Sequence, residues 1–184
     1  MDKEFELMEA VEQVREGWRK KAREVGKNVV APRAAEIDET GEFAWDLVEE
    51  YSQHGFLSLL IPKEYGGMDA DITSFCLVAE EIANYCASSA LLVIVQAVGT
   101  MPLVLGGTQE LKENFLARIA KEKALICFCV TEPDAGSDSA SIRTKAVLKG
   151  DHYLLNGRKC FITNGGVSNF YTVFAMTTSE LKME

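Results

Sequence analysis

The stretch Ala124-Leu-Ile-Cys-Phe-Cys-Val130 separates two parts of the chain that have different patterns. It is a short apolar run that ends at the turn-rich residues 132–136, which predicts a strand. Apolar residues recur every three or four positions before it, whereas short apolar runs alternate with turn formers after it. Helices followed by strands favour an α+β fold or two separate domains. We therefore predict an all-α helical domain over residues 1–123 and an antiparallel β-domain over residues 124–184.

The helical part begins with an amphipathic pattern. Its apolar stripe, with steps of three or four residues, consists of Leu7, Val11, Val14, Trp18, Ala22 and Val25, and it predicts one helix. Gly26 and Pro32 are expected to loosen or interrupt that helix, and a short second helix is expected over residues 34–37. A further helix is predicted over residues 43–56.

An apolar helix is predicted to lie at the centre of the helical domain. Residues 90–105 are apolar on nearly all sides, which is typical of a central helix of a bundle. Ser88 or Ser89 is the expected cap of this helix, and Asp71 or Thr73 the expected cap of the helix before it.

The β-domain offers four or five strands. After the first, strands are predicted at residues 142–149, 153–155, 159–163 and 170–176. Asn156-Gly157 is the strongest hairpin signal in the chain. The polar residues 179–184 complete no sheet, so the last strand would be an open edge. We expect this β-domain to be incomplete, cut within a domain.

Composition and charge argue against two classes of protein. The chain has 19 Lys and Arg against 28 Asp and Glu, a net charge of −9, and it lacks the basic face that nucleic-acid binding requires. No apolar stretch is expected to reach the length of a membrane span, the longest candidate being residues 90–98. The start Met-Asp-Lys-Glu lacks the features of a secretory or transit signal, so the expected location is cytoplasmic.

Cysteines and histidines give little sign of a metal site. The five cysteines are Cys76, Cys86, Cys127, Cys129 and Cys160, an odd number without Cys-x-x-Cys spacing. Cys127 and Cys129 would share one face of a strand as small buried hydrophobic residues. His54 and His152 lie far apart in the sequence. We therefore predict neither a disulfide scaffold nor a metal centre. With only two histidines, the sequence also gives little support for a Ser-His-Asp catalytic triad.

Two segments could carry chemistry. Thr131-Glu-Pro-Asp-Ala-Gly-Ser-Asp138 lacks the Lys of a phosphate-binding loop and holds three acids, so its amides and hydroxyls suit a neutral acceptor such as the edge of a heterocycle. In Gly157-Arg-Lys-Cys-Phe-Ile-Thr-Asn-Gly165, Phe161 and Thr163 would share one face of a strand and could hold a flat ring. From these residues alone, the first segment could equally be a polar turn between strands. Phe161 and Thr163 could equally be an ordinary cross-strand pair without a ligand.

Both segments resemble acyl-CoA dehydrogenases. That family carries Thr-Glu-Pro-x-Ala-Gly-Ser-Asp and, downstream, Asn-Gly-x-Lys-x-(Trp/Phe)-Ile-Thr-Asn, which stand here as residues 131–138 and 156–164. Ile61-Pro-Lys-Glu-Tyr-Gly-Gly67 and Met101-Pro102 followed by Gly107 extend the resemblance over essentially all 184 residues. The resemblance implies a helical domain, a middle β-domain and a C-terminal four-helix domain, with FAD between the last two. We expect the four-helix domain to be absent from this chain.

The resemblance also implies which residues bind the flavin. They are Phe128, Cys129, Val130, Thr131, Gly136, Ser137, Phe161, Ile162 and Thr163. Thr131 would bond the pyrimidine side of the ring, Thr163 would lie near N5, and Ser137 would also contact substrate on the CoA side. Phe161 replaces the Trp of many members and keeps the apolar contact without an indole N–H. Asp134, where Gly or Asn is common, changes the charge of the loop.

The reaction implied by the resemblance is the conversion of an acyl-CoA to a trans-2-enoyl-CoA, as in fatty acid β-oxidation. A proton leaves the α-carbon, and a hydride passes from the β-carbon to the flavin. In the family a C-terminal carboxylate takes the proton and an electron-transferring flavoprotein reoxidises the flavin. We therefore assign no catalytic residue here. We expect the chain alone to be inactive and to act in a homo-oligomer or with a complementing C-terminal subunit, and a short-chain, butyryl-type preference stays open.

Two other functions remain open at this point. The chain could be a non-catalytic, partner-binding subunit of a dehydrogenase-like heteromer, or a relative of the acyl-CoA oxidases, in which oxygen reoxidises the flavin. Visible flavin absorbance in the purified protein would argue against the first of these.

Overall fold

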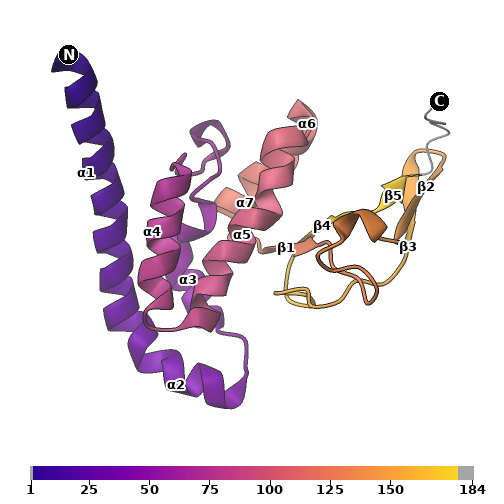
Figure 1. Cartoon of the computed structure of the whole chain (residues 1–184), viewed down its shortest axis with the longest axis horizontal. Coiled ribbons are helices and arrows are strands. Elements are labelled where there is room, and N and C mark those ends of the chain that lie inside the picture. The colour runs from indigo at the N-terminus through magenta and orange to yellow at the C-terminus, as the bar shows by residue number, and fades with distance from the viewer. Residues whose placement is uncertain (1, 178–184) are drawn as a thin grey trace.

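The computed structural model describes residues 2–177 and has a helical part followed by two small sheets (Figure 1). The helical elements are α1 (Asp2–Val25), η1 (Gly26–Val30), α2 (Ala31–Thr40), α3 (Trp45–Gln53), η2 (Phe56–Ser58), η3 (Lys63–Tyr65), α4 (Ile72–Ala83), α5 (Ala87–Gly106), α6 (Gln109–Leu111), η4 (Lys112–Leu116), α7 (Ala117–Lys121) and η5 (Ser139–Ser141). The strands are β1 (Ile126–Cys129), β2 (Lys145–Lys149), β3 (His152–Asn156), β4 (Phe170–Val173) and β5 (Met176–Thr177). The predicted order of helices and then strands is confirmed.

The first predicted helix exists, but its apolar stripe is used only in part. Trp18, Ala22 and Val25 pack in or against the main core, whereas Leu7 and Val14 are exposed. The N-terminal end of α1 projects beyond α4 (Figure 1). The helix is loosened at Gly26, where η1 is a π-helical turn, but it is not interrupted, because the chain stays helical to the end of α2.

α5 is the central helix of the bundle, as predicted, and packs against α4 and β1. Its N-cap is Cys86, so Ser88 and Ser89 lie inside its first turn and do not cap it. Asp71 does cap α4, because its carboxylate accepts a hydrogen bond from Ser74 N.

The expected absence of a span-length apolar stretch is wrong. The helix α5 has 20 residues and no charged side chain, and by length and composition it could cross a membrane. Half of the most apolar window is buried inside the protein, which is typical of the core helix of a folded domain.

The strands pair in both directions. β2 and β3 are antiparallel, as predicted, whereas β1 with β4 and β2 with β5 are parallel. β2, β3 and β5 form a sheet that lies farthest from α1 (Figure 1). This sheet exposes the apolar side chains Leu148, Tyr153, Leu154, Leu155 and Met176.

The predicted hairpin at Asn156-Gly157 is wrong. The turn between β2 and β3 is at Gly150, which has a φ of 66°. Gly157 lies instead against Thr144, where an added Cβ would be 2.6 Å from the Thr144 Cα. The glycine is needed here for close packing rather than for a turn.

Gln96 joins the helical part to the first strand. Its buried amide donates to the Ala124 carbonyl at 2.9 Å and accepts from the Ile126 N–H at 3.1 Å. The side chain therefore pairs with the β1 backbone much as a neighbouring strand would.

We expect Gln96→Leu to lower the free energy of unfolding by about 2–4 kcal/mol, because it leaves two buried backbone groups unpaired. Urea denaturation measures the loss. Gln53→Leu, at the exposed end of α3, should change it by less than about 0.5 kcal/mol. Equal effects of the two variants would contradict the assigned role of Gln96.

Candidate functional site

The two motif segments meet just beyond β1. Cys160 N donates a 3.0 Å hydrogen bond to the Thr131 carbonyl. The Lys159 ammonium donates to the Val130 carbonyl and to Glu132 Oε1, both at 2.8 Å. Hydrogen bonds thus join residues that are 27 to 29 positions apart in the sequence.

The Glu132 carboxylate accepts three hydrogen bonds, and the residue is only 6% exposed. Besides Lys159, the backbone N–H of Arg143 donates to Oε2 at 2.6 Å and that of Thr144 to Oε1 at 2.9 Å. Lys159 and these donors hold the pKa of Glu132 at about 2. Glu132 therefore fixes the positions of both segments and of the chain entering β2.

Stability should fall in acid because of this carboxylate. Its pKa is lowered in the folded state from an ordinary 4.5 to about 2, so its contribution is full above pH 4.5 and is lost as the pH falls toward 2. Asp71, whose pKa is also lowered to about 2, acts in the same direction.

We expect the stability difference between the parent and Glu132→Gln to be largest near pH 7 and to shrink toward zero by about pH 2. Urea midpoints across this range measure it. Asp134→Asn is the control, because Asp134 makes only an exposed ion pair with Arg143, worth about 0–1 kcal/mol. A difference independent of pH would refute the assignment.

The residues predicted on β1 and its loop have different surroundings. Phe128 packs edge-on against Phe174, with ring centroids 5.1 Å apart. Cys129 is buried, and its Sγ lies 3.6 Å from that of Cys127, so the predicted shared face is confirmed. Val130 and Thr131 are half-buried, and Gly136 and Ser137 are exposed.

The predicted strand over residues 159–163 is wrong. Phe161 has a φ of 55°, which no strand accommodates, and its ring is 93% exposed. Ile162 packs inward against the cluster of Val95, Cys127 and Cys129, whereas Thr163 is exposed. Phe161 and Thr163 are therefore both accessible, but they do not lie on one face of a strand.

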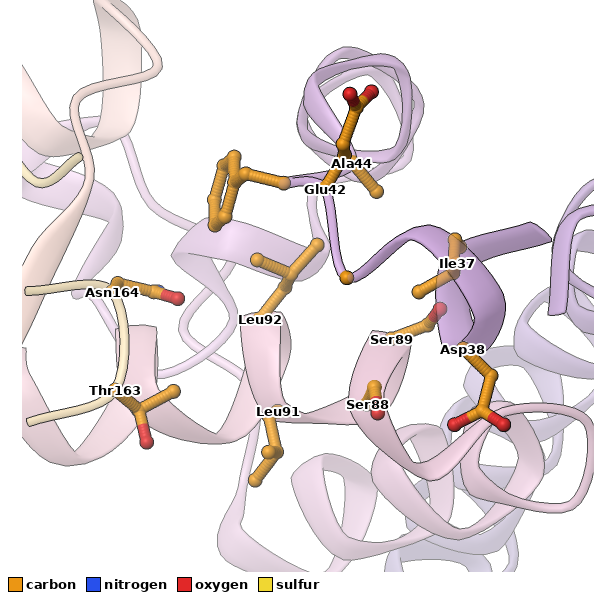
Figure 2. A pocket seen from close by; sticks show the side chains of 12 residues that line it. Ile37, Asp38, Glu42, Ala44, Ser88, Ser89, Leu91, Leu92, Thr163 and Asn164 are labelled. Carbon is orange, nitrogen blue, oxygen red and sulfur yellow. The ribbon is translucent and has the colours of Figure 1, made fainter. Parts of the chain in front are cut away.

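A pocket of about 330 Å3 lies beside Thr163 (Figure 2). Its lining consists of Ile37, Asp38, Gly41, Glu42, Phe43, Ala44, Ser88, Ser89, Leu91, Leu92, Thr163 and Asn164. We call this the Thr163 pocket. It combines the second motif segment with the start of α5 and the loop between α2 and α3, which no sequence pattern connects.

Comparison with known proteins agrees with the motifs. The family model for the N-terminal domain of acyl-CoA dehydrogenases matches residues 12–123, and that for the middle domain matches residues 127–184. Cyclohexane-1-carbonyl-CoA dehydrogenase of Geobacter metallireducens is 45% identical over 95% of this chain and 45% of its own length. The short-chain-specific acyl-CoA dehydrogenase of Clostridium acetobutylicum is 40% identical, over 86% of this chain and 42% of its own.

Solved structures have the same fold. The butyryl-CoA dehydrogenase of Megasphaera elsdenii superposes with a TM-score of 0.83, is 34% identical, and is matched over 92% of this chain and 45% of its own. A structure reported for the electron transferring flavoprotein of Acidaminococcus fermentans has a TM-score of 0.84 and 36% identity, over 89% of this chain and 43% of that one. The chain thus spans a little under half the length of the relatives it matches. With both domain models matching in order and covering most of its residues, the chain belongs to the acyl-CoA dehydrogenase family.

Proposed function

We propose that the chain is the helical domain (residues 1–123) and part of the middle β-domain (124–184) of an FAD-dependent enzyme that converts an acyl-CoA to a trans-2-enoyl-CoA. The observation that carries this proposal is the junction of the two motif segments by Lys159 and by the hydrogen bond from Cys160 to Thr131. The family matches to residues 12–123 and 127–184 support the division into domains.

FAD suits the groups that these segments present. An accessible aromatic ring at Phe161 can cover an apolar ring system. The hydroxyls of Thr131 and Thr163 can hydrogen bond its polar edge. The proposed flavin-binding residues are Phe128, Cys129, Val130, Thr131, Gly136, Ser137, Phe161, Ile162 and Thr163. Bound FAD would supply the hydride acceptor.

The protein's part is to orient the reactants and exclude water. Thr131 and Thr163 would fix the orientation of the ring, and the exposed Ser137 would contact the CoA side of the substrate. Glu132 is not the general base, because its hydrogen bonds hold its pKa at about 2. Asp134 is paired with Arg143. We therefore propose no catalytic base from this chain.

Partners and location are further parts of the proposal. An electron-transferring flavoprotein would reoxidise the flavin, which is supported by the similarity to the Acidaminococcus structure. The exposed apolar side chains of the β2, β3 and β5 sheet favour a homo-oligomer. Five free cysteines suit the reducing cytoplasm.

The test is to purify the complete gene product and to record its visible spectrum before and after anaerobic addition of an acyl-CoA. We expect bound FAD whose visible band bleaches on addition of substrate. Protein that acquires no flavin, even when FAD is supplied, would contradict the proposal and favour the non-catalytic subunit.

A further inference from the structure

The outer flank of α1 carries apolar side chains that the described residues do not cover. α1 forms one edge of the molecule, on the side away from the sheets (Figure 1). Its inner face is held on α4 by ion pairs of Arg15 with Asp71 at 2.6 Å and of Arg23 with Glu81 at 2.7 Å. Leu7 nevertheless stays 65% exposed. Apolar side chains that gather on an exposed surface indicate a contact with a partner.

A regular spacing defines this flank. Alternating steps of four and three residues connect Lys3, Leu7, Ala10, Val14, Gly17, Lys21 and Glu24. We call these seven residues the α1 seam, because this is the spacing of the contact residues in a coiled coil of two helices. Glu6 and Lys20 each precede a seam residue by one position, so both border the seam on the same side.

The seam contains a groove at Gly17. The groove has a volume of about 370 Å3, and its lining consists of Val14, Gly17, Trp18, Lys20, Lys21 and Glu24. A Cβ added at Gly17 would meet nothing within 4 Å, so no contact among the described residues requires a glycine there. A glycine inside a helix destabilises that helix relative to alanine. The glycine is explained if the groove admits a side chain from another molecule.

The charges of α1 are divided between its two halves. Residues 2–16 contain six acids and two bases, whereas residues 17–27 contain five bases and one acid. Two such helices attract each other when they run antiparallel and repel each other when they run parallel. The partner that this surface fits is therefore a second copy of the same helix.

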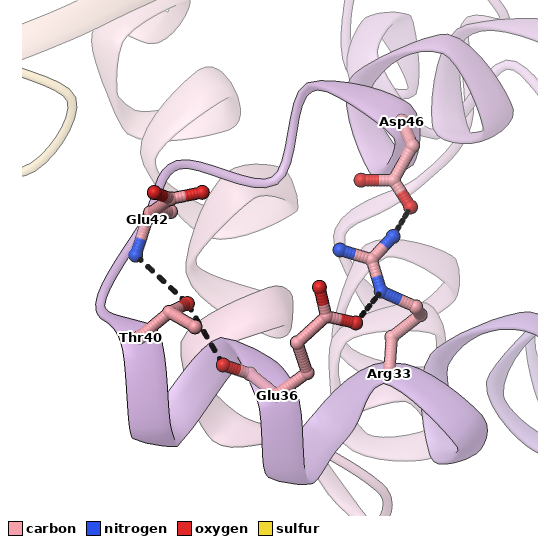
Figure 3. Close-up of polar contacts among 5 residues, drawn as sticks. All are labelled: Arg33, Glu36, Thr40, Glu42 and Asp46. Atoms are coloured by element: carbon pink, nitrogen blue, oxygen red, sulfur yellow. Dashed lines mark hydrogen bonds and ion pairs between the residues drawn. The ribbon is translucent and has the colours of Figure 1, made fainter.

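The charges beside the seam are available to such a partner. The Lys21 ammonium donates to the His54 carbonyl at 3.1 Å and is thus engaged within the chain. Lys20 and Glu6, by contrast, form no ion pair with any described residue. Arg33 on the next helix, α2, shows the usual arrangement, in which a cation is paired with acids of its own chain (Figure 3).

We propose that α1 binds a second copy of this chain in an antiparallel contact with two-fold symmetry, in which Leu7 of each copy enters the groove at Gly17 of the other. This register places Glu6 within reach of the partner's Lys20, and the symmetry repeats each contact. The inference goes beyond the proposed function and does not depend on it, because α1 contains none of the proposed flavin-binding residues.

The test follows the self-association of the complete gene product by sedimentation velocity at several concentrations. Lys20→Glu replaces an attraction by a repulsion at both symmetric contacts, so we expect it to raise the dissociation constant at least about tenfold. Lys27→Glu makes the same change at an exposed site outside the seam and should leave the constant unchanged.

Gly17→Glu fills the groove without harming the helix. Glutamate favours a helix more than glycine does, so the fold should be retained. The new carboxylate would meet the partner's Leu7, and we expect the association to weaken at least about tenfold.

A charge swap distinguishes a second copy from a different protein. Glu6→Lys alone should weaken the association as Lys20→Glu does. Both substitutions in one chain should restore the dissociation constant to within about threefold of the parent value, because each contact again joins a base to an acid. Only a contact between two copies of α1 predicts this rescue.

Three results would overturn the inference: an association that neither Lys20→Glu nor Gly17→Glu changes, a double variant that is not rescued, or a gene product that does not self-associate. A different protein in the groove would give the second or the third result. The visible flavin spectrum of the same samples tests the proposed function separately, because absence of FAD from the parent protein would leave the α1 contact standing.

Discussion

Lys159→Met is expected to weaken FAD binding to the complete gene product by at least about tenfold and to lower its melting temperature by several degrees. The side chain is 11% exposed and bridges the Val130 carbonyl and the Glu132 carboxylate. Removing it strands a buried carboxylate and releases the second motif segment from the first. Isothermal titration with FAD and thermal melting of the apoprotein measure the two effects.

Two further variants distinguish the loss of the specific Lys159 contacts from the loss of one positive charge anywhere on the chain. Lys149→Met, at the exposed end of β2, removes the same charge and should change neither quantity. Lys159→Met combined with Glu132→Gln should melt above Lys159→Met alone, because no unpaired carboxylate remains. Additive losses in the double variant would show that the two side chains do not act as a pair.

Gly157→Ala is expected to lower the free energy of unfolding by about 1–3 kcal/mol. The new Cβ would lie 2.6 Å from both Cα and Cβ of Thr144, and a backbone atom cannot move aside as the end of a flexible side chain can. Urea denaturation measures the cost.

Gly136→Ala is the matched control, because an added Cβ there meets nothing within 4 Å and the residue has no positive φ. We expect a change within about 0.5 kcal/mol for it. If both alanine variants were equally stable, the close contact between Gly157 and Thr144 would not exist in solution.

Periodicity predicted α1 and α5 because burial shapes their apolar spacing. Trp18, Ala22 and Val25 of the α1 stripe pack in or against the core, and the apolar α5 is the central helix. The caps were harder to predict: Asp71 accepts from the backbone as expected, whereas α5 begins after Cys86 and no side chain caps it.

The second motif segment could not be derived from local patterns. Its conformation is set by Lys159 and Cys160, which bond residues 130–132, and by the contact of Gly157 with Thr144. These contacts are specific to the tertiary structure, so alternation over residues 159–163 and the Asn-Gly pair both gave wrong predictions.

The Thr163 pocket was missed for the same reason. Its walls come from three stretches far apart in sequence, residues 37–44, 88–92 and 163–164. Only the folded chain places Asp38, Ser89 and Asn164 around the same pocket (Figure 2).

The central claim is that the segments around Thr131 and Thr163 together hold a flavin ring at the end of β1. A crystal structure of the complete gene product with FAD tests it most directly. We predict that the ring lies within hydrogen-bond distance of both hydroxyls, with Phe161 against it. Flavin bound at another surface, with both threonines open to solvent, would contradict the claim.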